Sequence, residues 1–286
     1  MPALLVTCDL ARRLEAAEAA FNLARLRALS GQCDNAAGVE IAHFGRAVCT
    51  WVGSRANNPS GNRVLGFSDE DAAALEEIVG WFRQRGGRMW FDAAPPLVGG
   101  ATLQHLTALG LQPARFFSVL CIDPARAPGA EMSATDIRRI APDRQAHDFA
   151  VPFCTGYGIP PEAHEATERS LPLEYSDPGW RIYVAYLEGQ PAAVACLHLE
   201  GTVGCVAAMA TAPQFRRRGC QSALLRRCIA DSAAEGCQLL AYQTGPASDS
   251  ERNVLRAGFQ VAYTKLVLSP SGVGTGQARV AEEGRG

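Results

Sequence analysis

Hydrophobic and polar positions in the second half of the chain follow a pattern typical of strands joined by short turns. From Trp180 the sequence reads WRIYVAYLEGQPAAVACLHLEGTVGCVAAMATAP, in which three mostly apolar runs are separated by Glu188-Gly189-Gln190 and Glu200-Gly201-Thr202. A glycine between polar neighbours is the composition of hairpin turns. We therefore predict three consecutive antiparallel strands in this stretch.

Helical spacing appears on both sides of these strands. Residues 218–235 are predicted to form a helix, because their apolar positions recur on one face: Ala223, Leu224, Cys228 and Ile229. A short strand at 137–140 and helices at 143–154 and 161–171 precede the hairpins. A strand at 238–243, a helix at 250–257 and a strand at 259–268 follow them. A hairpin meander followed by a crossover helix predicts a mixed α/β sheet.

The two halves of the chain resemble each other. GLQPARFFSVL begins at Gly110 and GFQVAYTKLVL at Gly258, with Gly, Gln, Ala, Val and Leu at the same offsets. Each stretch follows a short helix, at 103–109 and 250–257. Each of these helices follows a short strand, RMWFDAAP or QLLAYQTGP, and a longer helix before it. The same order of elements at nearly the same spacing predicts a tandem duplication.

Composition places the boundaries between the repeats. DPARAPGAEMSATD, from Asp123, is rich in proline, alanine and glycine and reads as a linker. We predict a first domain at 1–122, a linker at 123–134, a second domain at 135–270 and a flexible tail at 271–286. The predicted fold is α/β (α+β), in which each domain is a mixed, mostly antiparallel twisted sheet flanked by helices.

Charge and cysteine content narrow the classes of function. A net charge of −2 over 286 residues argues against a polyanion such as nucleic acid as the main ligand. The ten cysteines include no C-x-x-C and no zinc-like spacing, so we expect no metal and a reducing, cytoplasmic location. The first residues lack a basic segment, and their apolar run stops at Asp9. We therefore predict neither a signal peptide nor a membrane anchor.

Three arginines precede a glycine where a strand gives way to a helix, in ATAPQFRRRGCQSALLRRCIA from Ala210. A helix start exposes backbone N–H groups and the positive end of the helix dipole, which together attract a phosphate. Gly219 would let the phosphate approach the backbone, and Arg216, Arg217 and Arg218 would add charge-assisted hydrogen bonds. The alternative is an exposed helix start in a protein whose basic residues are almost all arginine.

The run from about 135 to 270 resembles the GNAT acyltransferase superfamily. APQFRRRGCQSALL is similar to the family's acyl-CoA-binding pattern R/Q-x-x-G-x-G/A, and NVLRAGF is similar to its closing helix and turn. The resemblance implies that the strand before the loop splays from its neighbour and that the pantetheine arm lies in the gap. It implies an acyl-CoA site formed by the following residues: Met209, Ala210 and Thr211 along the arm, Arg216, Arg217, Arg218, Gly219, Cys220, Gln221 and Ser222 around the pyrophosphate, and Asn253 on the other side of the arm.

The sequence departs from the family pattern at several positions. Gln221 stands where glycine or alanine is usual, and its side chain would either crowd the phosphate or donate to it. Val254 stands where the family often has a tyrosine as general acid, and VGCVAAMATAP lacks the carboxylate that often serves as general base. In the first half the matching segment is VLGFSDEDAAALEE. Its Ser68, Asp69 and Glu70 replace the phosphate-binding turn, and the two carboxylates would repel a pyrophosphate.

The missing acid and base leave the catalytic residues unassigned. Polar residues near the predicted site are candidates, and each has a structural alternative as packing or surface: His198, Cys205, Glu174, Tyr175, Asp177, Tyr242 and Tyr263. The first half, having lost the turn, is expected to be a structural partner.

The resemblance implies an N-acetyltransferase that uses acetyl-CoA or another acyl-CoA as cosubstrate. The acceptor would be an amine on a small molecule or a peptide, with no metal, nucleic acid or membrane as partner. The protein would be a monomer or a homodimer. The alternative is a non-catalytic acyl-CoA-binding sensor, which the missing acid and base favour. A third reading, a purely structural tandem domain, is disfavoured by the intact Arg-Gly turn of the second half.

Overall fold

The computed structural model describes residues 4–31, 33–128 and 135–270, which pack as two compact units. Of the described residues, unit 1 holds those up to Val119 and 261–270, and unit 2 holds those within Leu120–Gln260. The predicted tail and half of the predicted linker lie outside the described residues. Within the described residues, no helix combines the length and apolar composition needed to cross a bilayer.

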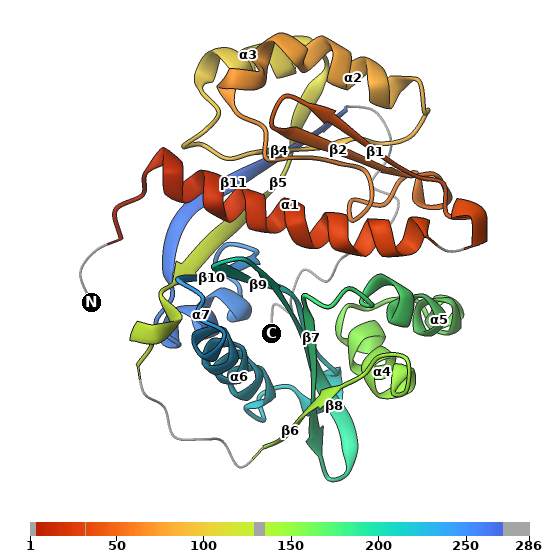
Figure 1. Ribbon diagram of the computed structural model, residues 1–286, viewed down its shortest axis with the longest axis vertical. Coiled ribbons are helices and arrows are strands. Elements are labelled where there is room, and N and C mark those ends of the chain that lie inside the picture. Colours follow the sequence, from red (N-terminus) through yellow and green to blue (C-terminus); the bar gives the residue numbers. More distant parts are fainter. Residues whose placement is uncertain (1–3, 32, 129–134, 271–286) are drawn as a thin grey trace. The chain divides into compact units, whose positions relative to one another are not determined.

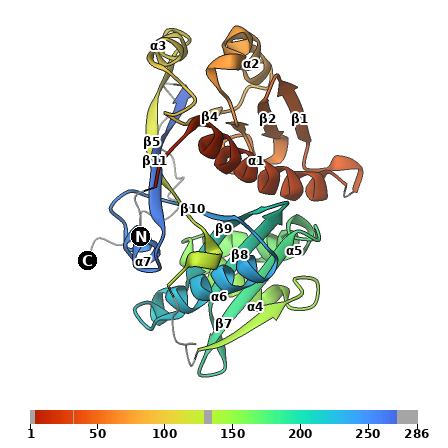
Figure 2. The same ribbon diagram turned by 60° about the vertical axis from the view of Figure 1, so that its left-hand side comes forward.

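Unit 1 combines helices with strands from the first part of the chain and one strand from its last part (Figure 1). Its helices are α1 (Cys8–Ser30), α2 (Leu75–Arg83) and α3 (Gly100–Ala108). Its strands are β1 (Val39–Phe44), β2 (Ala47–Val52), β3 (Arg63–Leu65), β4 (Trp90–Ala93), most of β5 (Leu111–Ile122) and nearly all of β11 (Gln260–Pro270). Ala19 and Leu23 of α1 pack on Val48 of β2 and Leu65 of β3. Figure 2 shows α1 beside strands β1 and β2.

The last strand of the chain belongs to the sheet of the first unit. The strand order is β1-β2-β3-β4-β11-β5, and β11 pairs antiparallel with β4 from Leu266 opposite Ala93 to Leu268 opposite Phe91. Lys265, the only lysine of the chain, is fully buried on this strand. The predicted second domain, at 135–270, therefore contributes its closing strand to the other unit.

Unit 2 contains the three predicted hairpin strands. They are β7 (Trp180–Leu187), β8 (Gln190–Glu200) and β9 (Val203–Thr211), and they are antiparallel as predicted. The remaining elements are β6 (Asp136–Ile140), α4 (Ala146–Gly156), α5 (His164–Glu174), α6 (Cys220–Ala234), β10 (Leu239–Thr244) and α7 (Asp249–Arg256). Figure 1 shows α6 on one face of this sheet and α4 and α5 on the other.

The sheet of unit 2 begins with the end of a strand from the first half. Its order is β5-β10-β9-β8-β7-β6, and Leu120 and Ile122 of β5 lie in the same apolar core as Leu240 and Tyr242 of β10. Strand β5 therefore ends in the sheet of unit 2, and β11 lies in the sheet of unit 1. This corrects the prediction of two separate tandem sheets, because the eleven strands follow one mixed order in which the closing strands β11 and β5 are neighbours.

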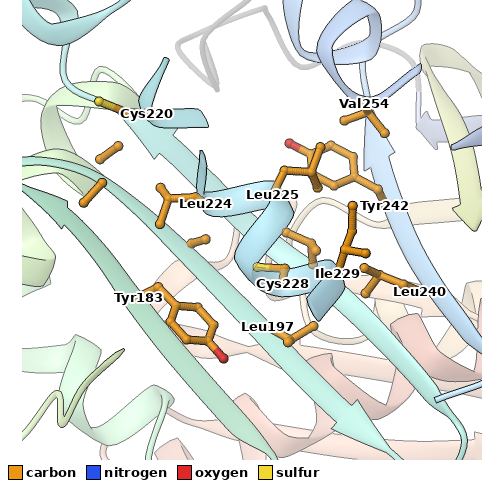
Figure 3. Close-up of a cluster of buried hydrophobic side chains, with 14 of the residues drawn as sticks. Tyr183, Leu197, Cys220, Leu224, Leu225, Cys228, Ile229, Leu240, Tyr242 and Val254 are labelled. Atoms are coloured by element: carbon orange, nitrogen blue, oxygen red, sulfur yellow. The ribbon is translucent and has the colours of Figure 1, made fainter. Parts of the chain in front are cut away.

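The core of unit 2 explains the apolar face predicted for the long helix. Leu224, Leu225, Cys228 and Ile229 of α6 are buried against the strands (Figure 3). Burial of such side chains contributes about 1.5–3 kcal/mol each. The helix is therefore held firmly on the sheet, and its first turn has a fixed position at the end of β9.

Candidate acyl-CoA site

The turn between β9 and α6 presents an uncapped helix start. A 3-10 helix at Pro213–Phe215 ends in Arg216, whose backbone is extended, and Arg217 and Gly219 then adopt positive φ values of 62° and 83°. Gly219 occupies the N-cap position of α6 and offers no side chain to its first amides. A Cβ at Gly219 would meet nothing within 4 Å. The turn is thus open above the helix amides, as an anion site requires.

The arginines of this turn are exposed and lie at its rim. Arg218 forms an ion pair of 2.5 Å with Glu188 in the β7–β8 turn. Arg216 donates to the carbonyl oxygen of Gly156 at 3.4 Å. Because exposed ion pairs contribute little to stability, Arg218 can exchange Glu188 for a phosphate at small cost.

Strands β9 and β10 separate beside this turn. Their parallel ladder ends where Val206 pairs with Tyr242, whereas β9 continues to Thr211 and β10 to Thr244. A bulge in β9 lies at the same level, because the register against β8 skips Ala207. The backbone of 207–211 therefore leaves the β10 ladder where the resemblance placed the pantetheine arm.

The end of helix α4 lies against this part of β9. A Cβ built on Gly156 would come within 2.8 Å of the Ala210 Cβ and 3.0 Å of the Thr211 nitrogen. The next residue, Tyr157, accepts a hydrogen bond from the Met209 N–H at 3.0 Å. Sequence reasoning missed Tyr157, because a tyrosine that follows a predicted helix by three residues carries no local signal of a site.

The side chain of Gln221 is hydrogen-bonded to helix α7. Its amide nitrogen donates to Ser250 Oγ at 3.0 Å, and its carbonyl oxygen accepts from Asn253 at 2.7 Å. Ser250 also bonds to the Tyr242 hydroxyl at 3.0 Å. The side chain of Gln221 therefore joins α6 to α7. Asn253, predicted to contact the arm, is part of the same network.

Some of the candidate catalytic residues gather at one end of the sheet. His198 is buried beside Asp177, with 3.7 Å between Nε2 and Oδ1, and its ring packs on Trp180 at 4.7 Å. Trp180 in turn packs on Tyr175 at 4.7 Å, and Glu174 beside it is buried. Burial lowers the pKa of His198 despite the opposing charge of Asp177.

The other candidates are held in the fold by contacts of their own. Tyr263 belongs to unit 1, where its hydroxyl donates to Glu15 at 2.7 Å. Cys205 lies opposite His198 on β9 and is buried. Val254, where the family often has tyrosine, is fully buried in the core of unit 2. In the described residues, no group of His, Cys, Asp and Glu side chains is arranged to hold a metal ion.

In the first half, side chains close the corresponding helix start. Ser68 and Asp71 form a capping box, in which Asp71 also accepts from the Arg46 N–H at 2.9 Å. Asp69 accepts from the Gly99 N–H and the Thr102 hydroxyl, and Glu70 pairs with Arg46. The amides of Ser68, Asp69 and Asp71 at this helix start therefore all have acceptors within the chain.

Comparison with known proteins identifies the second half. The model of the acetyltransferase (GNAT) family matches residues 147–259. Residues 147–259 are a GNAT acetyltransferase domain. The match begins in α4, contains the whole Arg-Gly turn and ends at Phe259, just before β11. No curated protein matches the sequence significantly.

Solved structures extend the likeness of the GNAT domain to most of the chain. A GCN5-related N-acetyltransferase from Kribbella flavida superposes with a TM-score of 0.65 at 16% identity, covering 92% of this chain and 96% of that one. A GCN5-related N-acetyltransferase from Sphaerobacter thermophilus gives 0.57 at 15%, with 80% and 81% coverage. A tandem GNAT protein from the clavulanic acid biosynthesis pathway gives 0.53 at 15%, with 72% and 73%. At these identities the likeness concerns the fold.

Proposed function

We propose that unit 2 is an acyl-CoA-dependent N-acetyltransferase that transfers an acetyl group to an amine of a small molecule or peptide. The single observation that carries this proposal is the open, uncapped start of α6 at Gly219, next to the end of β9 that has left its ladder. Family membership of residues 147–259 supports the reaction class.

Two parts of acyl-CoA match two parts of this site. The diphosphate, with its concentrated negative charge, would accept hydrogen bonds from the amides of residues 216–222 and from the arginines of the turn. The pantetheine arm carries amide groups that pair with an exposed strand edge, here that of Met209, Ala210 and Thr211. Bringing the thioester and an amine together on this frame lowers the entropic part of the barrier.

Calorimetric titration of acetyl-CoA into the Gly219→Glu variant tests the diphosphate site. The new carboxylate would face the diphosphate, and we expect affinity to fall on the order of 10–100-fold. Gly236→Glu is the matched control, because Gly236 also has positive φ, at 76°, and open space around its Cβ. Equal affinity in the two variants, or no binding by the wild type, contradicts the proposal.

A non-catalytic acyl-CoA sensor is the second candidate. It is favoured by Val254, whose complete burial leaves no acid at the position where the family often has tyrosine, and by the lack of a carboxylate on β9. The two functions differ in turnover. Release of free thiol from acetyl-CoA, rising with the concentration of a primary amine and with pH, supports the enzyme. Tight binding of acetyl-CoA without release across a broad panel of amines supports the sensor.

A further inference from the structure

The Met209 amide and the Tyr157 hydroxyl form a hydrogen bond at the point where β9 leaves β10. The distance is 3.0 Å, with the N–H donating to the phenol oxygen. Met209 lies three residues beyond Val206, the last residue of β9 paired with β10. A side chain from the end of α4 therefore binds a backbone donor on the strand edge that we assign to the acyl-CoA arm.

The direction of this amide follows from the pairing of β9 with β8. Successive N–H groups of a strand point alternately to its two sides. Ala212 donates to the Ala192 carbonyl of β8, so the N–H of Ala210 also points toward β8, and those of Met209 and Thr211 point away from it. The side away from β8 is the side of β10, the other neighbour of β9. The Met209 N–H thus faces the gap.

Three contacts fix the order of parts along this edge. Tyr157 bonds to Met209, Gly156 lies against Ala210 and Thr211, and the carbonyl of Gly156 accepts from Arg216 in the turn. An arm whose diphosphate lies at the turn therefore reaches Thr211 first and Met209 later. The far end of an acyl-CoA arm is its thioester. The Tyr157 hydroxyl, which accepts from the Met209 N–H in the free protein, thus lies where the reacting thioester carbonyl of a bound acyl-CoA would lie.

We propose that Tyr157 is a catalytic residue that forms an oxyanion site together with the Met209 amide, an inference that rests on the proposed acyl-CoA function. The thioester carbonyl oxygen replaces the phenol oxygen as acceptor of the Met209 N–H. The displaced hydroxyl then donates to the same carbonyl oxygen from the α4 side. Tyr157 lies between Gly156 and Gly158, the latter at a φ of 64°, and its ring packs on Phe153 at 5.0 Å. When acyl-CoA binds, the ring turns aside far enough for its hydroxyl to leave the front of the Met209 N–H and to stay within hydrogen-bond distance of the carbonyl oxygen.

The chemical step balances with these two donors and the two substrates. The neutral amine forms a C–N bond to the thioester carbon, and the carbonyl π electrons move to oxygen, where Met209 N–H and Tyr157 O–H stabilise the charge. The carbonyl re-forms, the C–S bond breaks, and its electron pair leaves on sulfur. The proton lost by the nitrogen passes to solvent and finally to the thiolate, giving an amide and CoA.

Selective labelling makes the Met209 amide directly observable. The chain has four methionines, of which one is Met1, so ¹⁵N-methionine labelling gives few amide signals, and Met209→Leu identifies the relevant one. We expect the Met209 signal of the wild type to move when acetyl-CoA binds and to move much less with CoA, which lacks the carbonyl. In Tyr157→Phe the signal of the free protein should shift upfield, because the amide loses its acceptor.

Turnover with a primary amine tests the catalytic role. Tyr157→Phe should lower kcat by about 10²–10³-fold, the cost of removing one oxyanion donor, and leave the KM for acetyl-CoA equal or lower. Tyr186→Phe is the control. The Tyr186 hydroxyl donates to Asp148 of α4 at 2.6 Å, and its loss should leave kcat unchanged. If the role of Tyr157 is merely structural, Tyr157→Phe changes the melting temperature but leaves kcat unaffected.

The outcomes separate this inference from the function on which it rests. If acetyl-CoA does not bind at all by calorimetry, the proposed function is wrong. If it binds and the Met209 signal stays in place, or if Tyr157→Phe keeps the wild-type kcat, the oxyanion site is wrong and the function stands. Binding without turnover of any amine excludes the catalytic role of Tyr157 and favours the sensor.

Discussion

Lys265 Nζ lies 2.8 Å from Glu15 Oε1 in the interior of unit 1, although one residue is in the last strand of the described chain and the other in its first helix. Glu18, Asp92 and Arg63 complete the buried cluster. A charge buried in this way is stable only while its partners are present, because removing one of them leaves the others unpaired in a poorly solvating interior. Strand β11 is therefore anchored in unit 1 by charge as well as by the sheet.

Replacing Lys265 should destabilise unit 1. Lys265→Met keeps most of the side-chain volume but leaves Glu15, Glu18 and Asp92 with Arg63 as their main cation, and we expect a loss of about 3–5 kcal/mol in the free energy of unfolding. Chemical denaturation measures it. Arg169→Met is the control, since Arg169 pairs with Glu165 on the exposed face of α5 and should cost less than about 0.5 kcal/mol. Similar values for the two variants would contradict the prediction.

The same cluster predicts a loss of stability in acid. Burial alone would raise the pKa of Glu18, but Lys265 and then Arg63 lower it to about 2. A lowered carboxyl pKa contributes stability above its ordinary value near 4.5, and this contribution disappears as the pH falls toward 2. Glu15 acts in the opposite sense, because burial raises its pKa and its contribution is lost as the pH rises through the raised value.

Unfolding measured from pH 5 to pH 2 checks this prediction. The wild type should lose stability over this range, and Glu18→Gln, already weaker at pH 5, should show a flatter profile. Glu15→Gln separates the two carboxyls, because it removes the opposing contribution and should steepen the acid loss. An unchanged slope in Glu18→Gln would assign the acid sensitivity to other groups.

Gln221→Ala should affect stability more than affinity. The side chain bonds to Ser250 and Asn253, so its removal leaves partly buried polar groups on α7 with fewer partners and should cost about 1–3 kcal/mol. The affinity for acetyl-CoA should change by less than about threefold, since the amide is already committed to α7. Calorimetry and thermal unfolding on the same samples provide the comparison. A tenfold loss of affinity with unchanged stability would show that the amide contacts the ligand.

Gly156→Ala should move the end of α4 away from β9. The added Cβ would lie 2.8 Å from the Ala210 Cβ and 3.0 Å from the Thr211 nitrogen, closer than packed atoms allow. We expect a cost of about 1–3 kcal/mol in stability and weaker binding of acetyl-CoA, because the strand edge beneath is displaced. Gly80→Ala in α2 is the control. Its Cβ would meet nothing within 4 Å, so a gain of about 0.4–1 kcal/mol is expected.

The sequence predicted the elements of the second half well because their signals are local. Hairpin turns at Glu188–Gln190 and Glu200–Thr202, and the apolar face of α6, depend on residues close together in the chain. The turn at Gly219 was visible for the same reason. Its positive φ and the residues that flank it are properties of a few consecutive positions.

Long-range pairing was not predictable from one sequence. GFQVAYTKLVL carries the signal of a strand, but nothing in it says that Lys265 faces Glu15 rather than a residue of its own half. Tyr157 is a similar case, because its hydroxyl reaches Met209 only after α4 has packed on the sheet. The similarity between the halves predicted two equivalent closing strands, β5 and β11. Their sequence pattern alone does not decide which of them lies beside β4 and which beside β10. Register and partner are then decided by side-chain contacts distant in sequence.

The placement of β5 and β11 has a consequence for any attempt to divide the protein. A chain cut between its repeats would yield two pieces, each missing a strand of its own sheet and carrying one that belongs to the other. Deleting the first half, in which Ser68 and Asp71 close the helix start, would therefore remove β5 from the sheet that carries the open turn. Neither half is therefore expected to keep a complete sheet when it is expressed without the other.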